Sequence, residues 1–276
     1  MITAQLKGGI GNVMFQIAAG YGLAARLKTG VAFDLFEPGI IKQRAVYHGI
    51  TNYSYADNIL SNISNHKFDE NIVWKTLNEH QADYRKRNLN KLSRGNINYK
   101  LVGYFQSESY FQHIREEILN IYKIPLYIER YIAQKYGHIY KESHTVSLHV
   151  RRGDYLNLAE SHPLCELQYY YDAIDRIVEQ NTIILIFSDD LEWCRNNLRG
   201  KNYIYIQELD YISLFMMSLC EHNIIANSSF SWWGAWLNDS RSKRVIAPRP
   251  WLGTCHSDSS WWDENIYCKD WEVIGE

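Results

Sequence analysis

Short apolar strands alternate with helices along the second half of this chain, and this alternation constrains the fold more than any other feature of the sequence. Strands that alternate with helices form a parallel sheet covered on both faces, so the expected fold class is α/β. The pattern predicts strands at 145–150, 182–187, 203–206, 223–226 and 244–247. It predicts helices at about 167–180, 211–220 and 231–237.

A similar series opens the chain. Its expected elements are a strand at 1–6, a tight loop at 8–12, a helix at 13–28, a strand at 30–34 and helices at 110–122 and 126–136. Two such series predict two Rossmann-like domains that face a cleft, residues 1–140 and 141–276, joined in a polar stretch near 137–144. Open α/β sheets bind ligands beyond the carboxyl ends of their strands, so the residues there are the candidates for function.

Composition and charge exclude several classes of protein. The 276 residues are 46% hydrophobic, which is enough for a proper core, and the formal net charge is −2. A protein that holds nucleic acid by bulk electrostatics normally has a basic face, so no nucleic-acid partner is expected. The five cysteines include no Cys-x-x-Cys pair, which favours a reducing compartment. With neither a signal peptide nor a run of ~20 apolar residues, we expect a cytoplasmic protein without a membrane span, at most peripheral to the inner membrane.

Two adjacent arginines, Arg151 and Arg152, follow the strand at 145–150, and Gly153 and Asp154 come directly after them. A guanidinium is always charged, and its planar fork of donors matches phosphate oxygens. The pair therefore predicts a site for a nucleotide diphosphate. The alternative is an exposed salt bridge between Arg152 and Asp154, which would contribute little.

Two other strand ends are candidates for binding an anion. Glycines at 8, 9 and 11, followed by Asn12, let the backbone approach a ligand just before a helix, whose free N–H groups favour negative charge. This is not the dinucleotide fingerprint, because Met14 stands where that motif requires Gly or Ala. Ser228 and Ser229 open a later helix in the same way. A plain tight turn and an ordinary helix cap are the alternatives.

Asp189 follows the strand at 182–187. Its carboxylate is suited to accept paired hydrogen bonds from N1–H and the amino group of guanine, or to cap the next helix, which is the commoner role. No Asp-x-Asp pair is present to clamp a divalent metal against nucleotide phosphates. No Gly-x-Ser-x-Gly or His-Glu-x-x-His motif supports a hydrolase or a zinc protease.

Three long segments closely resemble the signatures of the α-1,2-fucosyltransferases, glycosyltransferase family 11. They are residues 8–16, 149–155 and 227–236, and they occur in the family's order. Residues 103–108 and 162–170 are similar to the family too, so the resemblance spans nearly the whole chain. One departure is Val13, where the family often has Gln.

This resemblance implies a GT-B-like fold, with an acceptor-side N-terminal domain and a C-terminal domain that binds GDP-fucose. The implied reaction transfers L-fucose from GDP-β-L-fucose to O2 of a terminal β-galactoside, with inversion and without a metal or cofactor. The implied partners are GDP-fucose and a galactose-terminated oligosaccharide or lipid-linked glycan of a bacterial surface, such as an O-antigen.

The resemblance also implies roles for residues that match its motifs. Arg151 balances the charge that grows on GDP as the bond between fucose C1 and phosphate breaks. Apart from the resemblance, the proton of the acceptor O2 needs an acceptor, for which Asp154 and Glu160 are the candidate general bases; the alternative is an oxocarbenium-like path with late proton loss, which needs only a weak base. The other donor-binding residues implied are Gly9, Gly11, Asn12, His149, Asp189, Ser228 and Ser229.

Two alternatives stay open at this point. A carbohydrate-binding protein would use the nine tryptophans and 21 tyrosines as stacking platforms, but this leaves the arginine pair and the two anion sites unexplained. A fucosyltransferase of different linkage is the other alternative. We expect the contacts that select the acceptor between residues 37 and 100, where the periodicity is weak.

Overall fold

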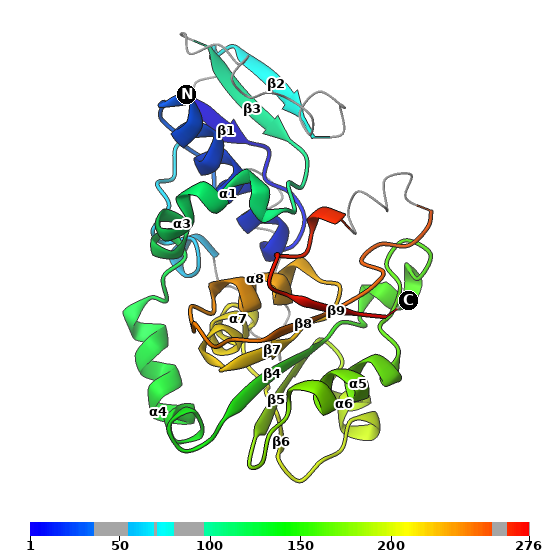
Figure 1. Cartoon of the computed structure of the whole chain (residues 1–276). Helices are drawn as coiled ribbons and strands as arrows, with labels where there is room; N and C mark the ends of the chain where they lie inside the picture. The colour runs from blue at the N-terminus through cyan, green and yellow to red at the C-terminus, as the bar shows by residue number, and fades with distance from the viewer. Residues whose placement is uncertain (36–54, 69–70, 80–96, 256–263, 276) are drawn as a thin grey trace. The chain divides into compact units, whose positions relative to one another are not determined.

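The computed structural model describes residues 1–35, 55–68, 71–79, 97–255 and 264–275 (Figure 1). The chain divides into two compact units, Met1–Lys123 and Ile124–Glu276. The junction expected at residue 140 lies inside helix α4 (Leu126–Glu142), which belongs to the second unit. Each unit is described by itself.

The described part of the first unit contains a parallel sheet in the order β1-β3-β2 (Figure 1). Its strands are β1 (Ile2–Ala4), β2 (Trp74–Asn78) and β3 (Asn98–Val102). The strand expected at 30–34 is reduced to isolated parallel bridges, from Val31 to Ile2 and from Phe33 to Asn65. The shorter helical elements are η1 (Tyr55–Asp57), η3 (Glu108–Tyr110), η4 (Gln112–Ile114) and α3 (Arg115–Ile121).

Helix α1 (Ile10–Leu27) begins three residues earlier than the sequence predicts. Gly9 is its N-cap with an extended backbone, so the tight loop is confined to Gly8 and Gly9, and Gly11 and Asn12 lie in the first turn of the helix. Gly8 has a φ of 83°, which favours glycine. The predicted loop at 8–12 was therefore too long, because the helix can start directly after an extended glycine.

A buried carboxylate that the sequence did not single out holds the segment after β3. Glu79 is fully buried, and its Oε2 accepts the backbone N–H groups of Tyr104 at 2.7 Å and Phe105 at 2.8 Å. Phe105 has a φ of 54°, an unfavourable conformation for an aromatic residue. The hydrogen bonds to Glu79 compensate for this conformation and fix the turn that follows the strand.

The second unit is built on a parallel sheet in the order β6-β5-β4-β7-β8-β9. Its strands are β4 (Thr145–Val150), β5 (Ile183–Ser188), β6 (Tyr203–Tyr205), β7 (His222–Ile224), β8 (Val245–Pro248) and β9 (Glu272–Ile274). Strand β4, the first of this unit, lies in the middle of the sheet. The next two strands, β5 and β6, are added on one side of β4, and β7, β8 and β9 on the other. This is the Rossmann strand order, with its topological switch point between β4 and β7.

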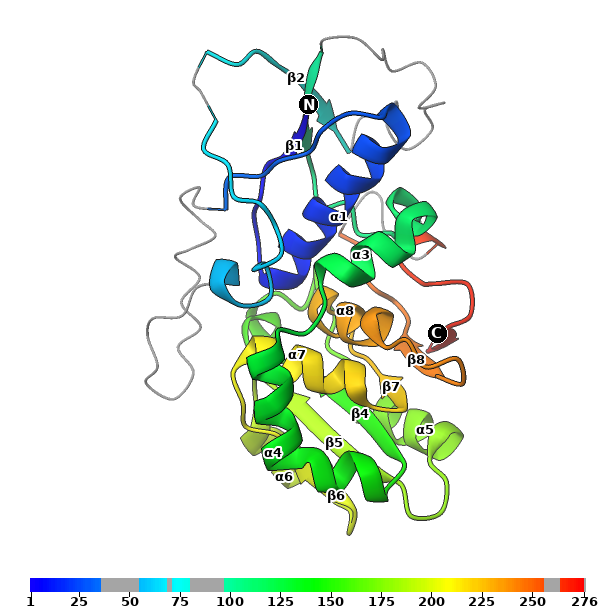
Figure 2. The ribbon, with the colours of Figure 1, turned by 90° about the vertical axis from the view of Figure 1, so that its left-hand side faces the viewer.

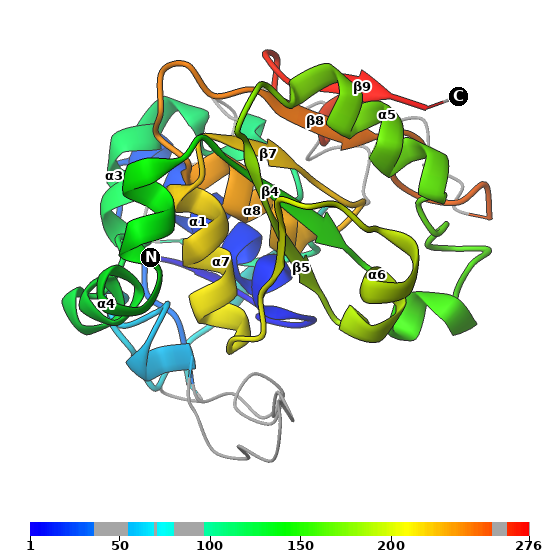
Figure 3. The same cartoon turned by 90° about the horizontal axis from the view of Figure 1, so that it is seen from below.

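Helices cover both faces of this sheet. Figure 3 shows α5 (Leu167–Ile177) and α6 (Leu191–Asn197) on one face, and α7 (Asp210–Leu219) and α8 (Ser229–Leu237) on the other. Helix α4 lies beside α7 (Figure 2), where the Tyr140 hydroxyl donates to the Met216 carbonyl at 3.0 Å. All six residues of β4 are buried, as expected for a central strand covered on both faces.

The tryptophans of α8 belong to the core. Trp232, Trp233 and Trp236 are each at most 1% exposed and pack against one another, and the Trp232 indole N–H donates to the Ile266 carbonyl at 2.7 Å. Buried rings cannot serve as stacking platforms for a sugar. This removes part of the basis for the carbohydrate-binding alternative.

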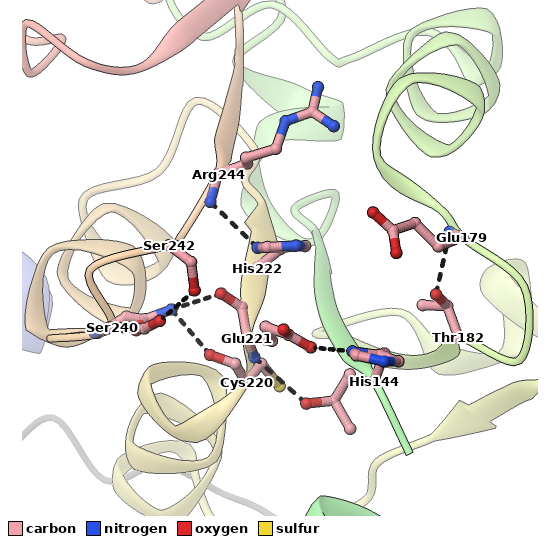
Figure 4. Close-up of polar contacts among 11 residues, drawn as sticks. His144, Glu179, Thr182, Cys220, Glu221, His222, Ser240, Ser242 and Arg244 are labelled. Carbon is pink, nitrogen blue, oxygen red and sulfur yellow. Dashed lines mark hydrogen bonds and ion pairs between the residues drawn. The ribbon is translucent and has the colours of Figure 1, made fainter.

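The amino-terminal ends of the central strands carry a polar cluster, drawn in Figure 4. His144 Nδ1 lies 2.6 Å from Glu221 Oε2, which joins the residue before β4 to the residue before β7. The backbone N–H of Arg244 donates to His222 Nδ1 at 3.1 Å and joins β7 to the start of β8. This cluster lies at the edge of the sheet opposite to the carboxyl ends.

The His144–Glu221 pair predicts a pH-dependent contribution to stability. The hydrogen bond that His144 donates to the Glu221 carboxylate raises the pKa of His144 above its usual value. The contribution is therefore complete below the unfolded-state pKa of about 6.5 and is lost as pH rises through the raised folded-state pKa. We expect His144→Gln to lower the Tm at pH of about 6 and to have little effect at pH of about 9. Thermal unfolding across this pH range tests the prediction, with His138→Gln on α4 as control. A difference in Tm between His144→Gln and the wild type that does not change with pH would contradict it.

Candidate functional site

The topological switch point gathers the polar ends of three strands. Strand β4 pairs with both β5 and β7, so the residues that follow these strands lie at one edge of the sheet. Arg151 follows β4, Asp189 follows β5, and Ser228 lies four residues after β7. The edge thus combines two arginines, acidic side chains and the start of a helix.

Arg151 is held by two carboxylates. Its Nη2 lies 2.6 Å from Asp154 Oδ1, and its Nη1 lies 2.9 Å from Asp189 Oδ2. Its Nε is buried and makes no hydrogen bond with the described residues. The guanidinium also lies 5.2 Å from the centre of the Tyr155 ring. The Nε–H of this cation is therefore left without a hydrogen-bond acceptor among the described residues.

Arg152 has a different environment. Its Nε donates to Asp190 Oδ2 at 3.2 Å, and its guanidinium lies 4.2 Å from the centre of the Trp193 ring. Its backbone N–H donates to Asp189 Oδ1 at 2.9 Å. The pairing of Arg152 with Asp154 considered from the sequence is wrong, because the two guanidiniums diverge and Asp154 pairs with Arg151. Arg152 braces the loop against α6.

Gly153 allows this arrangement. A Cβ atom at this position would lie 2.5 Å from Asp189 Oδ2, inside van der Waals contact. Asp189 can therefore reach both Arg151 and the N–H of Arg152 only because residue 153 lacks a side chain. Asp190, not Asp189, caps the next helix, with Oδ1 accepting the Trp193 N–H at 3.0 Å.

His149 is a buried, neutral imidazole at the end of β4. It is 4% exposed, and burial together with the charge of Arg151 lowers its pKa to about 3. Its Nδ1 has no hydrogen-bond partner among the described residues, and its ring centre lies 5.5 Å from that of Phe230. Buried polar atoms are nearly always paired, so this nitrogen marks a place where a ligand can supply the missing bond.

The start of α8 is open to an anion. Ser228 is the N-cap with an extended backbone, and its side chain makes no capping hydrogen bond. The Ser231 hydroxyl instead donates back to the Ala226 and Ser228 carbonyls, each at 3.3 Å. The first N–H groups of a helix have no partner within it and carry a partial positive charge. Ser228 is buried and Ser229 half-buried beside this helix terminus.

Asn227 joins three segments at this edge, a function that the sequence did not assign. Its side-chain Nδ2 donates to the carbonyls of Pro163 at 2.8 Å and Trp251 at 3.1 Å, and its own carbonyl accepts from the Tyr155 hydroxyl at 3.1 Å. Burial raises the pKa of Tyr155 to about 12, which keeps that hydroxyl a donor. The sequence offered two signals, an amide close after an apolar strand and its place at the start of the family-like segment 227–236, but neither showed these contacts.

The structure places Glu160 away from these contacts. It is exposed, and its carboxylate forms no ion pair or hydrogen bond with the described residues. Its backbone carbonyl accepts from the Cys255 thiol at 3.1 Å. Of the two carboxylates expected as general base, only Asp154 touches Arg151.

The remaining predicted residues, Gly9, Gly11 and Asn12, belong to the first unit. A Cβ on Gly9 would meet no described atom within 4 Å, so the N-terminus of α1 is approachable there. Gly11 is buried in the helix. Asn12 Oδ1 accepts from Gln106 Nε2 at 2.5 Å, and its N–H donates to the Gly9 carbonyl at 2.9 Å.

No cluster of three or more His, Cys, Asp or Glu side chains is placed to hold a metal ion in the described part of the chain. No described helix is long and apolar enough to cross a membrane.

The contact between residue 153 and Asp189 predicts the effect of a methyl group. Gly153→Ala should lower the free energy of unfolding by about 1–3 kcal/mol, because the new Cβ displaces a carboxylate fixed by two bonds. Gly137→Ala is the matched control, since its Cβ would meet no described atom within 4 Å and α4 should gain up to about 1 kcal/mol. Denaturant unfolding measures both; equal stability of Gly153→Ala and wild type would contradict the packing.

Comparisons with known proteins show the family of this chain. Residues 35–275 match the model of Glycosyl transferase family 11. The chain is 29% identical over 278 residues to the alpha-1,2-colitosyltransferase of Escherichia coli, covering 91% of this chain and 92% of that protein. It is 32% identical over 290 residues to the O-antigen biosynthesis glycosyltransferase WbnK of Escherichia coli, covering 90% and 93%.

Among solved structures, the fucosyltransferase NodZ from Bradyrhizobium is similar at a TM-score of 0.50 and 11% identity, covering 84% of this chain and 90% of that chain. The α/β class and the GT-B-like fold expected from the sequence are confirmed. The family resemblance is confirmed as well: with residues 35–275 matched by one family model, the chain belongs to glycosyltransferase family 11.

Proposed function

We propose that this enzyme transfers L-fucose from GDP-β-L-fucose to O2 of a terminal β-galactoside, with inversion and without a metal. One observation carries the proposal. At the switch point, the buried Nε of Arg151 and Nδ1 of His149 lack partners among the described residues, beside a helix start without a side-chain cap. An unused guanidinium N–H, an unpaired ring nitrogen and a positive helix terminus at one strand edge suit a nucleotide diphosphate.

The chemistry assigned to Arg151 follows from charge balance. As the bond between fucose C1 and the β-phosphate oxygen breaks, its electron pair passes to that oxygen, and the guanidinium stabilises the growing negative charge. The acceptor O2 forms the new bond to C1 from the opposite face and loses its proton to a base. Asp154 is better placed for this base than Glu160, because it already contacts Arg151 at 2.6 Å.

On this proposal, further residues bind the donor, and they are named for each unit by itself. In the second unit, Ser228 and Ser229 offer hydroxyls and helix N–H groups, and His149 and Asp189 contact guanine or ribose. Both oxygens of Asp189 already bind the arginine pair, so each would have to share a lone pair with the base. In the first unit, the residues proposed to bind the donor are Gly9, Gly11 and Asn12.

The acceptor is proposed to be a galactose-terminated oligosaccharide or lipid-linked glycan, bound on the side of the first unit, with the reaction taking place in the cytoplasm. The Escherichia coli protein WbnK, named for O-antigen biosynthesis, supports a surface glycan. The contacts expected between residues 37 and 100 fall mostly outside the described residues.

A second candidate donor is the colitose counterpart of GDP-fucose. The observation that favours it is the 29% identity to an alpha-1,2-colitosyltransferase over 91% of this chain. Product formation from each nucleotide sugar on one β-galactoside separates the two donors.

The test of the proposal is isothermal calorimetry with GDP, UDP and ADP in EDTA. We expect GDP to bind best, and Arg151→Ala to weaken GDP by about tenfold or more, because a charged donor is lost. The transfer rate should fall by about a hundredfold or more, the equivalent of roughly 3 kcal/mol. Arg241→Ala is the matched control, as an exposed arginine of the same unit.

Two results would count against the donor assignment. One is binding without a preference for guanine, and the other is GDP affinity that is the same in Arg151→Ala and the wild type. Either result, combined with binding of galactosides alone, would favour the carbohydrate-binding alternative.

A further inference from the structure

The two carboxylates on Arg151 are held in different ways. Asp189 is 27% exposed, and its second oxygen is fixed by the backbone N–H of Arg152 at 2.9 Å. Asp154 is 59% exposed and starts a 3-10 turn (η5, Asp154–Asn157). Among the described residues, its carboxylate has only Arg151 as a partner. Asp189 is therefore fixed by two contacts, whereas the carboxylate of Asp154 is held by its ion pair with Arg151 alone.

Asp154 and an incoming anion would compete for the same guanidinium, that of Arg151. A guanidinium binds phosphate with two parallel N–H groups, and the side-on edge is formed by Nε and Nη2. In this structure Nη2 donates to Asp154 at 2.6 Å, while the buried Nε has no partner among the described residues. Nη1 lies 2.9 Å from Asp189. A phosphate that binds through Nε and Nη2 therefore brings a second anion to the atom that Asp154 already contacts, and the two negative charges repel each other.

We propose that Asp154 is a displaceable counter-ion of Arg151, and that the diphosphate of the donor takes its place on the Nε–Nη2 edge. The released carboxylate then accepts the proton of the acceptor O2, while C1 bonds to O2 and the electron pair of the broken C1–O bond stays on the β-phosphate. This inference rests on the proposed function. It adds an order to the reaction: the base becomes available only when the donor is bound.

Displacement lowers the apparent affinity for the donor. A ligand that must first break an internal ion pair binds in proportion to the fraction of molecules in which that pair is open. The pair is partly exposed, so it is worth about 1 kcal/mol at most, or roughly a three- to fivefold change in affinity. Asp154→Asn keeps the shape of the side chain and removes the charge.

The experiment measures GDP and guanosine binding to Asp154→Asn, with Glu160→Gln as the matched control for loss of one negative charge on the same segment. Asp154→Asn should bind GDP about three- to fivefold more tightly and guanosine unchanged, since only the phosphates compete with Asp154. Its transfer rate should fall by about a hundredfold or more. The tightening should vanish in the Arg151→Ala background, because the two residues act as a pair.

The results separate this inference from the proposed function. If the wild type binds GDP through Arg151 but Asp154→Asn binds it equally or more weakly, the inference is overturned and the donor site stands. Three other results would also overturn the inference, because each indicates a general effect of charge. They are equally tighter GDP binding in Glu160→Gln, equally tighter guanosine binding in Asp154→Asn, and equally tighter GDP binding when Asp154→Asn is combined with Arg151→Ala. Asp154→Ser, which should tighten GDP binding in the same way, replaces Asp154→Asn if thermal unfolding shows that variant to be unfolded. Absence of GDP binding to the wild type would contradict the proposed function itself.

Discussion

Backbone pairing of β4 with both β5 and β7 is the interaction on which the site depends. All six residues of β4 are buried, so the strand cannot shift its register without exposing apolar side chains or burying polar ones. Its last residue therefore delivers Arg151 to a fixed point between Asp189 and the start of α8. The pairing of the strands thus fixes the positions of the site residues, and the contacts of the surrounding loops adjust only the directions of their side chains.

Most of the second unit could be predicted from its sequence because buried parallel strands are nearly continuous apolar runs. Strands β4, β5 and β8 and helices α7 and α8 begin within about two residues of the expected positions. Helix α6 and strand β9 were missed, since seven polar-rich residues and three half-buried ones carry little periodicity. In the first unit, Glu79 was missed because nothing in sequence marks a carboxylate that binds backbone 25 residues away.

The site was predictable as a set of residue types but not as a set of contacts. Charged and hydroxyl residues after strands identify the edge where ligands bind. Which carboxylate meets which guanidinium depends on side-chain directions, and the structure pairs Asp154 with Arg151 where the sequence suggested Arg152. The unpartnered ring nitrogen of His149 likewise becomes visible only when its burial is known.

The hydrogen bonds of Asn227 couple two segments that are far apart in the sequence. One amide ties the segment that contains Pro163 to the segment that contains Trp251, although 88 residues separate them in the chain. Both segments are therefore held by one side chain, and loss of the Asn227 amide would release two parts of the strand edge at once.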